Sequence, residues 1–600
     1  MVKLTKLTGG QIVAEYLLLE GVPLVAGIPG HGCLALVDAF RDRREQLRVI
    51  QVRQEMAAVH LADGYYRVTG QPLAVFTSIG PGAINTAIGA ATCYVDSTAC
   101  LILTGETHTY MFGKGVLQEI GRAHPANFPR VLEPVVKRWW QVTDVRQLPA
   151  VLRQAFRAMR AGRPGPVLID LPMDVQAEAA EVVLLPDRDP RPPAAGDSGE
   201  IERAATLLAK AARPVILAGG GVNLSQAWGE LRQLAELSGA AVVTTLPGKG
   251  CFPEDHPRAG WLAGSKGTTL GNALTRQADV LLAVGCRFAD ETTSSYRKGI
   301  SFAIPPTRLI HVDIEAAEIG KNYPAEVGIV GDLRPVLSQL EQALGGHKQP
   351  DRSAFHAQIE ALRQEWLASL AEFRDSDRVP VTISRALREI RAVLPREAIV
   401  ASSSGNTQAQ ILQEFPFYLP RTNLTTGGFS TMGWSLPAAL GAKLARPETP
   451  VVGIVGDGDF LMTIQELATA VQHEIPVVIV VMNNRSWKSI ADLQQAVYGE
   501  ERIYACDFAR GDGKLVTPDF VRVAEGFGCW AKRVERPEEV GPALQQALAQ
   551  GRPAVLEITV NRDFPYSGGR AVGWWDVPVP TYLGERRRSY EQERSEEQLY

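Results

Sequence analysis

The chain has 600 residues, of which 45% are hydrophobic and 21% are charged, and its formal net charge is −4 at pH 7. These proportions are ordinary for a globular protein, but the length exceeds what one core can organise, so about two to four domains are expected. The charge provides no broad basic field, which argues against nucleic acid as a partner.

The seven cysteines are scattered and include no CxxC pair. This usage is typical of small buried side chains in a reducing compartment. The start of the chain has the pattern of an amphipathic helix rather than of a signal peptide. No stretch approaches ~18 uninterrupted apolar residues, so no membrane partner is expected and the predicted location is cytoplasmic.

Residues 1–183 alternate helical and strand patterns and predict a first α/β unit. A helix is predicted over 8–21, and a helix of small residues over 56–70. Short apolar strands separated by helices are typical of a doubly wound parallel sheet. The predicted strands cover 24–28, 49–52, 73–77, 100–103 and 167–171.

Residues 184–200 are rich in Pro, Asp and Gly without any period, which indicates a linker. A second, Rossmann-like unit is predicted over 201–345. Its turn Gly219-Gly220-Gly221 is not a full dinucleotide fingerprint, which favours a tight packing turn. The predicted strands of this unit cover 214–218, 241–245, 280–284, 308–312 and 328–330.

Residues 346–380 are polar with a mostly helical pattern and predict a second linker. It leads to a third unit over 381–565 and a tail over 566–600. The expected fold class is therefore α/β, with three doubly wound parallel-sheet domains. The predicted strands of the third unit cover 398–402, 451–455, 475–482 and 553–560.

Two polar turns of the third unit predict a metal–diphosphate site. Asp457 lies in a GDGD turn after the strand 451–455, a helix is predicted over 463–473, and Asn484 follows the next strand. Both turns emerge at the carboxyl edge of a parallel sheet, where ligands bind. Their hard oxygen donors suit Mg²⁺ or Ca²⁺, and a helix N-terminus favours phosphate. A plain βαβ unit with a glycine-rich turn would also explain the GDG motif alone.

The whole GDG…NN arrangement resembles the thiamine diphosphate motif of the acetolactate synthase, pyruvate oxidase and decarboxylase superfamily. The resemblance implies pyrimidine-binding, middle and diphosphate-binding domains in the three units. It implies thiamine diphosphate and Mg²⁺ as cofactors, with FAD or ADP as a further candidate for the middle domain. The implied metal ligands are Asp457, Asn484 and the backbone carbonyl of Ser486.

Glu55 follows a strand and starts the helix of small residues. The resemblance extends here through R-x-E, ADGYxRxTG and SxGPG, and it implies that Glu55 bonds N1′ of the cofactor's aminopyrimidine. That bond promotes loss of the thiazolium C2 proton, so the cofactor becomes a carbon nucleophile. The alternative is a carboxylate that only stabilises the helix dipole, by roughly 0.3–1 kcal/mol.

Further residues match cofactor contacts of the superfamily. Met432, in FSTMGW, matches the apolar wedge between the two rings of the cofactor, and the alternative is an ordinary core methionine. The backbone of Ser430 would hold the aminopyrimidine. The residues that resemble diphosphate contacts are Gly405, Asn406, Thr407, Gly458 and Asp459.

Three residues of the first unit are candidates for the reaction centre. His31 lies in a GIPGHG turn and predicts an acid/base or substrate-binding group, because an imidazole transfers protons near neutral pH. Gln118 matches a glutamine near the reacting carbon, with an exposed loop amide as the alternative. Lys137 resembles a substrate-side lysine, with a solvated lysine as the alternative.

The sequence defines the substrate branch less well. Acetolactate synthases carry an arginine in an RFxDR motif, where this chain has Glu291, and a tryptophan where it has Leu493. Leu493 and Ile490 share the loop after the second metal turn, so both are substrate-side candidates. The two departures favour a C–C lyase of the 2-hydroxyacyl-CoA type. The alternatives are a hydrolase of cyclic 1,2-diones from inositol catabolism and an acetolactate synthase-type carboligase on pyruvate.

The three branches share addition of the cofactor ylide to a carbonyl, followed by a carbanion or enamine intermediate. The implied partner is a 2-hydroxyacyl-CoA, a 2-keto acid or a cyclic dione. The resemblance also implies a homodimer or homotetramer, in which Glu55 and Asp457 of one site come from different subunits. A flavin-dependent oxidase and a catalytically silent homologue remain as other classes, and the tail 566–600 is a candidate lid over the site.

Overall fold

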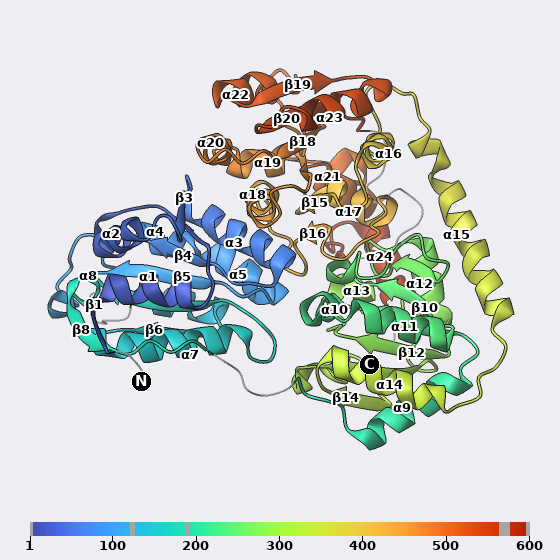
Figure 1. The fold of residues 1–600 in the computed structure, drawn as a ribbon. Helices are drawn as coiled ribbons and strands as arrows, with labels where there is room; N and C mark the ends of the chain where they lie inside the picture. Colours follow the sequence, from blue (N-terminus) through green and yellow to red (C-terminus); the bar gives the residue numbers. More distant parts are fainter. Residues whose placement is uncertain (1–3, 121–126, 188–192, 563–575, 596–600) are drawn as a thin grey trace.

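The structure is a computed structural model that describes residues 4–120, 127–187, 193–562 and 576–595. It contains three six-stranded sheets, one in each predicted unit. The strand pairings within these sheets are parallel, which confirms the α/β class with three parallel-sheet domains. In Figure 1 the first unit (blue) lies on the left, the middle unit (green) at the lower right and the third (orange to red) above it.

The first sheet has the strand order β3-β2-β4-β5-β7-β6. Its central strands are fully buried and mostly apolar, as expected for strands covered by helices on both faces. A separate antiparallel pair, β1 (Thr5–Thr8) with β8 (Ala179–Val182), ties the start of the unit to its end. The strands of the sheet are β2 (Leu24–Gly27), β3 (Arg48–Gln51), β4 (Ala74–Thr77), β5 (Leu101–Glu106), β6 (Arg138–Gln141) and β7 (Val167–Pro172).

The middle and third sheets repeat this architecture, with orders β11-β10-β9-β12-β13-β14 and β16-β15-β17-β18-β20-β19. The middle strands are β9 (Pro214–Ala218), β10 (Ala241–Thr244), β11 (Ala259–Leu262), β12 (Val280–Val284), β13 (Arg308–Asp313) and β14 (Val327–Val330). Those of the third unit are β15 (Ile399–Ser402), β16 (Asn423–Thr425), β17 (Val451–Gly456), β18 (Val478–Asn483), β19 (Trp530–Val534) and β20 (Ala554–Thr559).

Two helices pack the first unit against the third. Glycines bring α3 (Glu55–Thr69) and α18 (Ser435–Ala445) into backbone contact, because a Cβ on Gly64 would overlap Ala438. One apolar core therefore runs through both units, whereas the middle unit has its own. Because Glu55 begins α3, this contact also fixes its place relative to the third unit.

The helix predicted over 463–473 is wrong in its bounds. The structure has two helices there, α19 (Asp457–Thr463) and α20 (Glu466–Gln472). The GDGD segment is therefore the start of a helix rather than a loop, because acidic side chains stabilise a helix N-terminus. The helix predicted over 8–21 is observed as α1 (Gly9–Leu19).

The two linkers differ in character. Helix α9 (Ser198–Lys210) already begins within the predicted linker 184–200 and is capped by Asp197. The second linker contains α15 (Ser353–Arg374), which runs along one side of the molecule in Figure 1. Among the helices within the described ranges, none has both the length and the apolar character needed to cross a membrane.

Candidate active site

Asp457 lies at the carboxyl end of β17 and is the first residue of α19. It is 2% exposed, and its carboxylate accepts hydrogen bonds from the backbone N–H of Gly458 (2.9 Å) and Arg485 (2.5 Å). Burial raises its pKa to about 6, against the effect of these backbone bonds. A cation bound beside this buried carboxylate would favour its charged form.

The loop after β18 lies directly on Asp457. Asn484 is buried, and its Oδ1 accepts from the N–H of Ser486 at 3.1 Å. The indole of Trp487 covers Gly458 so closely that a Cβ there would overlap the ring. The start of α19 and the adjoining loop after β18 therefore carry the three predicted metal ligands.

The donor set of these loops fits Mg²⁺. In the part of the chain that the structure describes, no group of three or more His, Cys, Asp or Glu side chains is arranged to hold a metal ion. A metal here would depend on one carboxylate, one amide oxygen and one carbonyl oxygen, completed by phosphate oxygens. Hard oxygen donors with few carboxylates are typical of magnesium sites on phosphate ligands.

Asp459 has a different environment from the one predicted. Its carboxylate accepts from the Ser403 hydroxyl, from the Gly433 N–H and, at 3.4 Å, from the Ser435 hydroxyl. Burial raises its pKa to about 6. The side chain thus joins the loop after β15 to the turn that carries Met432, and it leaves backbone atoms for the predicted diphosphate contact.

The predicted diphosphate residues Gly405, Asn406 and Thr407 start helix α17 (Gly405–Glu414). Gly405 has a φ of 80°, a conformation that a side chain would strain. Asn406 donates to Asp492 at 3.0 Å, while its buried Oδ1 has no hydrogen-bond partner among the described residues. A buried acceptor without a protein partner indicates a place for a water molecule or for a donor of a ligand, because an amide oxygen cannot bond a diphosphate oxygen directly.

The turn that carries Ser430 and Met432 is held from both sides. Ser430 has a φ of 49°, and its hydroxyl oxygen lies 3.0 Å from that of Ser404. The next residue, Thr431, pairs with Thr92 of the first unit at 2.7 Å between the hydroxyl oxygens. Met432 is half-buried, so a ligand can reach part of its side chain.

Glu55 lies at the carboxyl edge of the first sheet and is 9% exposed. The amide of Asn85 donates to its Oε2 at 2.9 Å, and a Cβ on Gly82 would lie 3.0 Å from its Oε1. Asn85 therefore orients the carboxylate, and the glycine leaves room beside it. Sequence reasoning missed Asn85, whose only signal is its position three residues after Gly82 on the short helix α4 (Pro81–Asn85).

His31 and Gln118 lie at the same edge of the first sheet as Glu55. Both are exposed, and His31 begins the single turn η1 (His31–Cys33) after β2. The N–H of the neighbouring Gly32 donates to the Ser78 hydroxyl at 3.2 Å, which joins this turn to the one after β4. Gln118 packs its backbone against Gly80 of that second turn. The structure thus brings three predicted residues to one edge.

Lys137 is not part of this group. It lies just before β6, at the amino end of a parallel strand, which is the opposite edge of the sheet from Glu55. Its ammonium donates to the carbonyl oxygens of Ala161 (2.8 Å) and Arg163 (2.7 Å), and burial lowers its pKa. These contacts are those of a structural lysine.

The two substrate-side candidates lie on α21 (Lys488–Tyr498), directly after the metal loop. Ile490 is 48% exposed and Leu493 is half-buried. Glu291, at the position of the expected arginine, accepts from the Lys266 ammonium at 2.9 Å. Lys266 also donates to Gln408 of α17 at 3.1 Å, which links the middle unit to the diphosphate segment.

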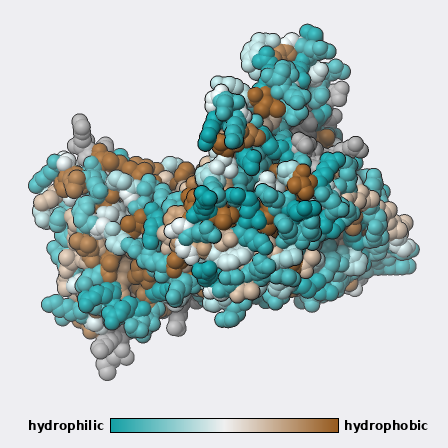
Figure 2. Space-filling view, turned by 90° about the horizontal axis from the view of Figure 1, so that it is seen from above, coloured by the Kyte–Doolittle hydropathy of each residue, from teal (hydrophilic) through white to brown (hydrophobic). Residues whose placement is uncertain are grey.

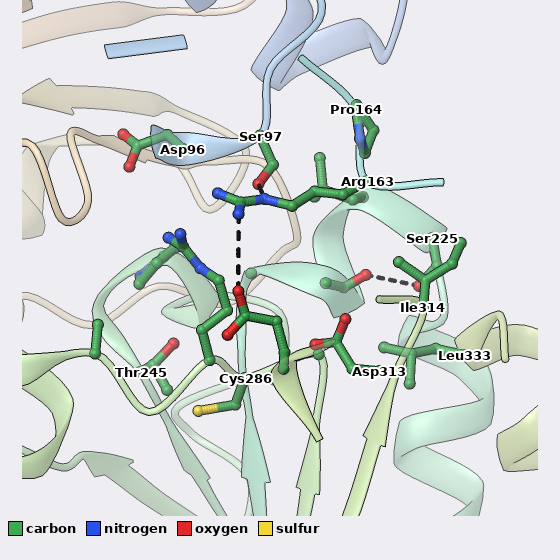
Figure 3. Close-up of a pocket in the computed structure, with 18 of the residues that line it drawn as sticks. Asp96, Ser97, Arg163, Pro164, Ser225, Thr245, Cys286, Asp313, Ile314 and Leu333 are labelled. Atoms are coloured by element: carbon green, nitrogen blue, oxygen red, sulfur yellow. Dashed lines mark hydrogen bonds and ion pairs between the residues drawn. The ribbon is translucent and has the colours of Figure 1, made fainter. Parts of the chain in front are cut away.

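A cavity of about 360 Å³ lies between the first and middle units. Its floor is the carboxyl edge of the middle sheet, where Asp313 ends β13, and the triple glycine packs against Gly285. Arg163 enters from the first unit, where its guanidinium donates to Ser97 at 2.6 Å and faces Glu318 at 4.0 Å (Figure 3). Arg160 and Arg287 also line the cavity.

The described part of the tail contacts both the middle and the third unit. The N–H of Asp576 donates to Ser295 at 3.1 Å, and Arg586 of α24 (Gly584–Ser595) donates to the Val497 carbonyl at 3.4 Å. The segment therefore lies against the end of α21. Residues 566–575 of the predicted lid lie outside the described residues.

Comparisons with known proteins agree with this arrangement. Residues 7–125, 201–340 and 403–558 match the thiamine pyrophosphate enzyme N-terminal TPP binding domain, central domain and C-terminal TPP binding domain. The chain is 37% identical over 567 residues to a probable acetolactate synthase large subunit of Methanocaldococcus jannaschii, covering 92% of each chain. It is 36% identical to an acetolactate synthase of Mycobacterium bovis, covering 94% of this chain and 89% of that one. It is 34% identical to the acetolactate synthase isozyme 3 large subunit of Escherichia coli, covering 92% of this chain and 95% of that one. With all three domains matched in order, the chain belongs to the thiamine pyrophosphate enzyme family.

Proposed function

We propose that the chain is a thiamine diphosphate- and Mg²⁺-dependent carboligase of the acetolactate synthase type, acting on 2-keto acids such as pyruvate. The observation that carries this proposal is the 34–37% identity, over about nine-tenths of both chains, to proteins named acetolactate synthase. The lyase of the 2-hydroxyacyl-CoA type, favoured by the substitutions at Glu291 and Leu493, has less support.

The site residues supply what this chemistry needs. When bound, thiamine diphosphate supplies a carbon nucleophile and an electron sink for making or breaking a C–C bond next to a carbonyl. The carboxyl group of Glu55, oriented by Asn85, would donate its proton to N1′ of the aminopyrimidine and so promote proton loss at C2. Asp457 and Asn484 would hold Mg²⁺ on the diphosphate. These roles require a buried carboxylate at one end of the cofactor and hard oxygen donors at the other.

Two features of the substrate side favour an altered acceptor. Glu291 presents a carboxylate that is neutralised by Lys266, where the resemblance leads one to expect an arginine. Leu493 presents an aliphatic side chain where a tryptophan is expected. A second 2-keto acid would therefore meet a less cationic and less aromatic surface than in typical acetolactate synthases.

A substrate screen tests this proposal. Pyruvate, a 2-hydroxyacyl-CoA and a cyclic 1,2-dione are each incubated with the enzyme, thiamine diphosphate and Mg²⁺. We expect turnover of pyruvate with release of CO₂ and formation of the condensation product, both followed by NMR. If pyruvate is not turned over while the acyl-CoA or the dione is cleaved rapidly, the protein is a lyase or a hydrolase and not a carboligase.

We further propose that the cavity between the first and middle units binds a nucleotide, FAD or ADP. It lies at the carboxyl edge of a parallel sheet, where such ligands bind. The guanidinium groups of Arg163 and Arg287 suit a diphosphate, because arginine donates paired hydrogen bonds to phosphate. Asp313, at the end of β13, suits a ribose hydroxyl.

Arg163→Ala is expected to weaken FAD or ADP binding about 10–100-fold, which corresponds to losing one charge-assisted hydrogen bond. Titration of flavin fluorescence and calorimetry with ADP measure the two affinities. Arg41→Ala, on the exposed face of α2 (Leu34–Asp42), serves as the control. Unchanged affinity in Arg163→Ala would place the nucleotide elsewhere.

We also propose that the cofactor lies between the first unit of one chain and the third unit of a partner. Large apolar side chains are exposed on both units, and Figure 2 shows such residues over the first unit on the left. Contiguous exposed apolar surface is typical of protein contacts. The residues concerned are Leu34, Ile88, Tyr94, Tyr110, Leu117 and Ile120 on the first unit, and Phe429 and Met462 on the third.

A further inference from the structure

A buried carboxylate of the third unit contacts the segment that leads into Glu55. Glu466, the first residue of α20, has no exposed surface. Its two oxygens accept from the backbone N–H of Arg53 at 3.1 and 3.3 Å, and the hydroxyl of Thr469 donates to it at 2.6 Å. Arg53 precedes Glu55 by two residues, so this contact is made immediately before the start of α3.

Further hydrogen bonds join α20 and the residue after it to β3, the strand that precedes Arg53. The imidazole of His473, just after α20, accepts from the N–H of Gln51 at 2.9 Å, and its carbonyl accepts from Arg48 at 2.7 Å. Gln472 donates to the Gln51 side chain at 3.1 Å. Figure 1 shows α20 beside β3, the strand that ends at Gln51. The position of Glu55 thus depends on α20 as well as on its own helix.

Burial of a carboxylate at this contact costs free energy, because its charged form loses its hydration. Burial raises the pKa of Glu466 to about 7, although hydrogen bonds from Thr469 and Arg53 oppose the shift. A hydrogen bond to a carboxylate is stronger than one to a neutral acceptor, so the ionised form of Glu466 holds the backbone N–H more tightly. A displacement of about 1 Å at a reacting group can reduce a rate about 100-fold.

We propose that Glu466 is a positioning residue for Glu55, acting through the backbone N–H of Arg53. The proposal rests on the function proposed above, in which Glu55 promotes loss of the C2 proton of the cofactor. Glu466 touches neither cofactor nor substrate in this arrangement. Its loss should slow activation of the cofactor without removing the groups that hold the diphosphate.

The test compares Glu466→Gln with Glu474→Gln, which alters an exposed carboxylate just after the same helix. The rate of hydrogen–deuterium exchange at C2 of bound thiamine diphosphate is measured by NMR after acid quenching, beside the cofactor affinity. We expect Glu466→Gln to slow the exchange about 10–100-fold, with an affinity close to wild type. Glu474→Gln should leave both quantities unchanged.

A second variant and a parallel control keep the outcomes separate. Glu466→Asp retains the charge but retracts it by one methylene group, so it should slow the exchange less than Glu466→Gln does. The proposal would be overturned if both Glu466 variants exchanged the C2 proton at the wild-type rate. It would also be overturned if the exchange rate fell only in proportion to a loss of affinity for thiamine diphosphate. Glu55→Gln is measured alongside them. If Glu55→Gln exchanges normally, the proposed role of Glu55 fails; if it alone is slow, only the role of Glu466 fails.

Discussion

Glu55→Gln is expected to lose nearly all activity, with a fall in kcat of about 100–10,000-fold, the range for removal of a positioned acid–base group. The amide keeps the shape of the side chain and can still meet Asn85. It cannot accept a proton or stabilise a charge on the aminopyrimidine as a carboxylate does. Steady-state turnover of the substrate identified in the screen measures the loss.

The same variant should still bind its cofactor. The predicted diphosphate contacts belong to the third unit and do not include Glu55. The affinity for thiamine diphosphate should therefore fall far less than kcat. Glu474→Gln is the matched control, because it makes the same chemical change at an exposed position. Full activity in Glu55→Gln would contradict the assigned mechanism.

Asp457→Ala is expected to lose activity by failing to hold the metal and the diphosphate. The variant removes a charged donor and leaves the N–H groups of Gly458 and Arg485 without their acceptor. Affinity for Mg²⁺ in the presence of thiamine diphosphate should fall by about 100-fold or more. Loss of a residue that only orients a metal ligand already costs up to about 100-fold, and Asp457 is a predicted direct ligand. Calorimetry measures this, and Asp512→Ala, in an exposed loop, is the control.

The two inactive variants also test where the site is built. If Glu55 and Asp457 of one site come from different subunits, a hybrid dimer of Glu55→Gln and Asp457→Ala chains contains one intact site. Random pairing makes half of the dimers hybrids, so co-expression should restore about a quarter of wild-type activity. Restoration of none would show that each site lies within one chain.

The central strands could be predicted from the sequence because they are buried on both faces. Such strands need near-continuous apolar runs, as in β4, β12 and β17, and the runs are visible without any alignment. The strands that prediction missed in the three sheets, β6, β11, β16 and β19, all lie at sheet edges. Edge strands pair on one side, so short or partly polar segments such as Asn423–Thr425 and Trp530–Val534 suffice there.

The same reasoning explains which candidate site residues the sequence could place on the sheet. Glu55, Asp457 and Asn484 each follow a recognisable buried strand, and parallel strands deliver their carboxyl ends to one edge. Lys137 precedes β6, an edge strand that was not predicted. The sequence therefore did not show that Lys137 lies at the amino end of a strand, on the opposite edge of the sheet from Glu55. Asp459 lies in a recognised motif, but its hydrogen bonds to Ser403 and Gly433 depend on loops far apart in the sequence.

The sequence by itself determined the three α/β units and the cofactor class, and it predicts the two ends of the cofactor site, because strand ends and short motifs are local features. Only the tertiary structure decided how those ends are supported. Asn85 orients Glu55, and Glu466 holds the segment before it from more than 400 positions along the chain. Such contacts have no periodic signal, since they arise only when separate units pack together and bury polar groups that must then find partners.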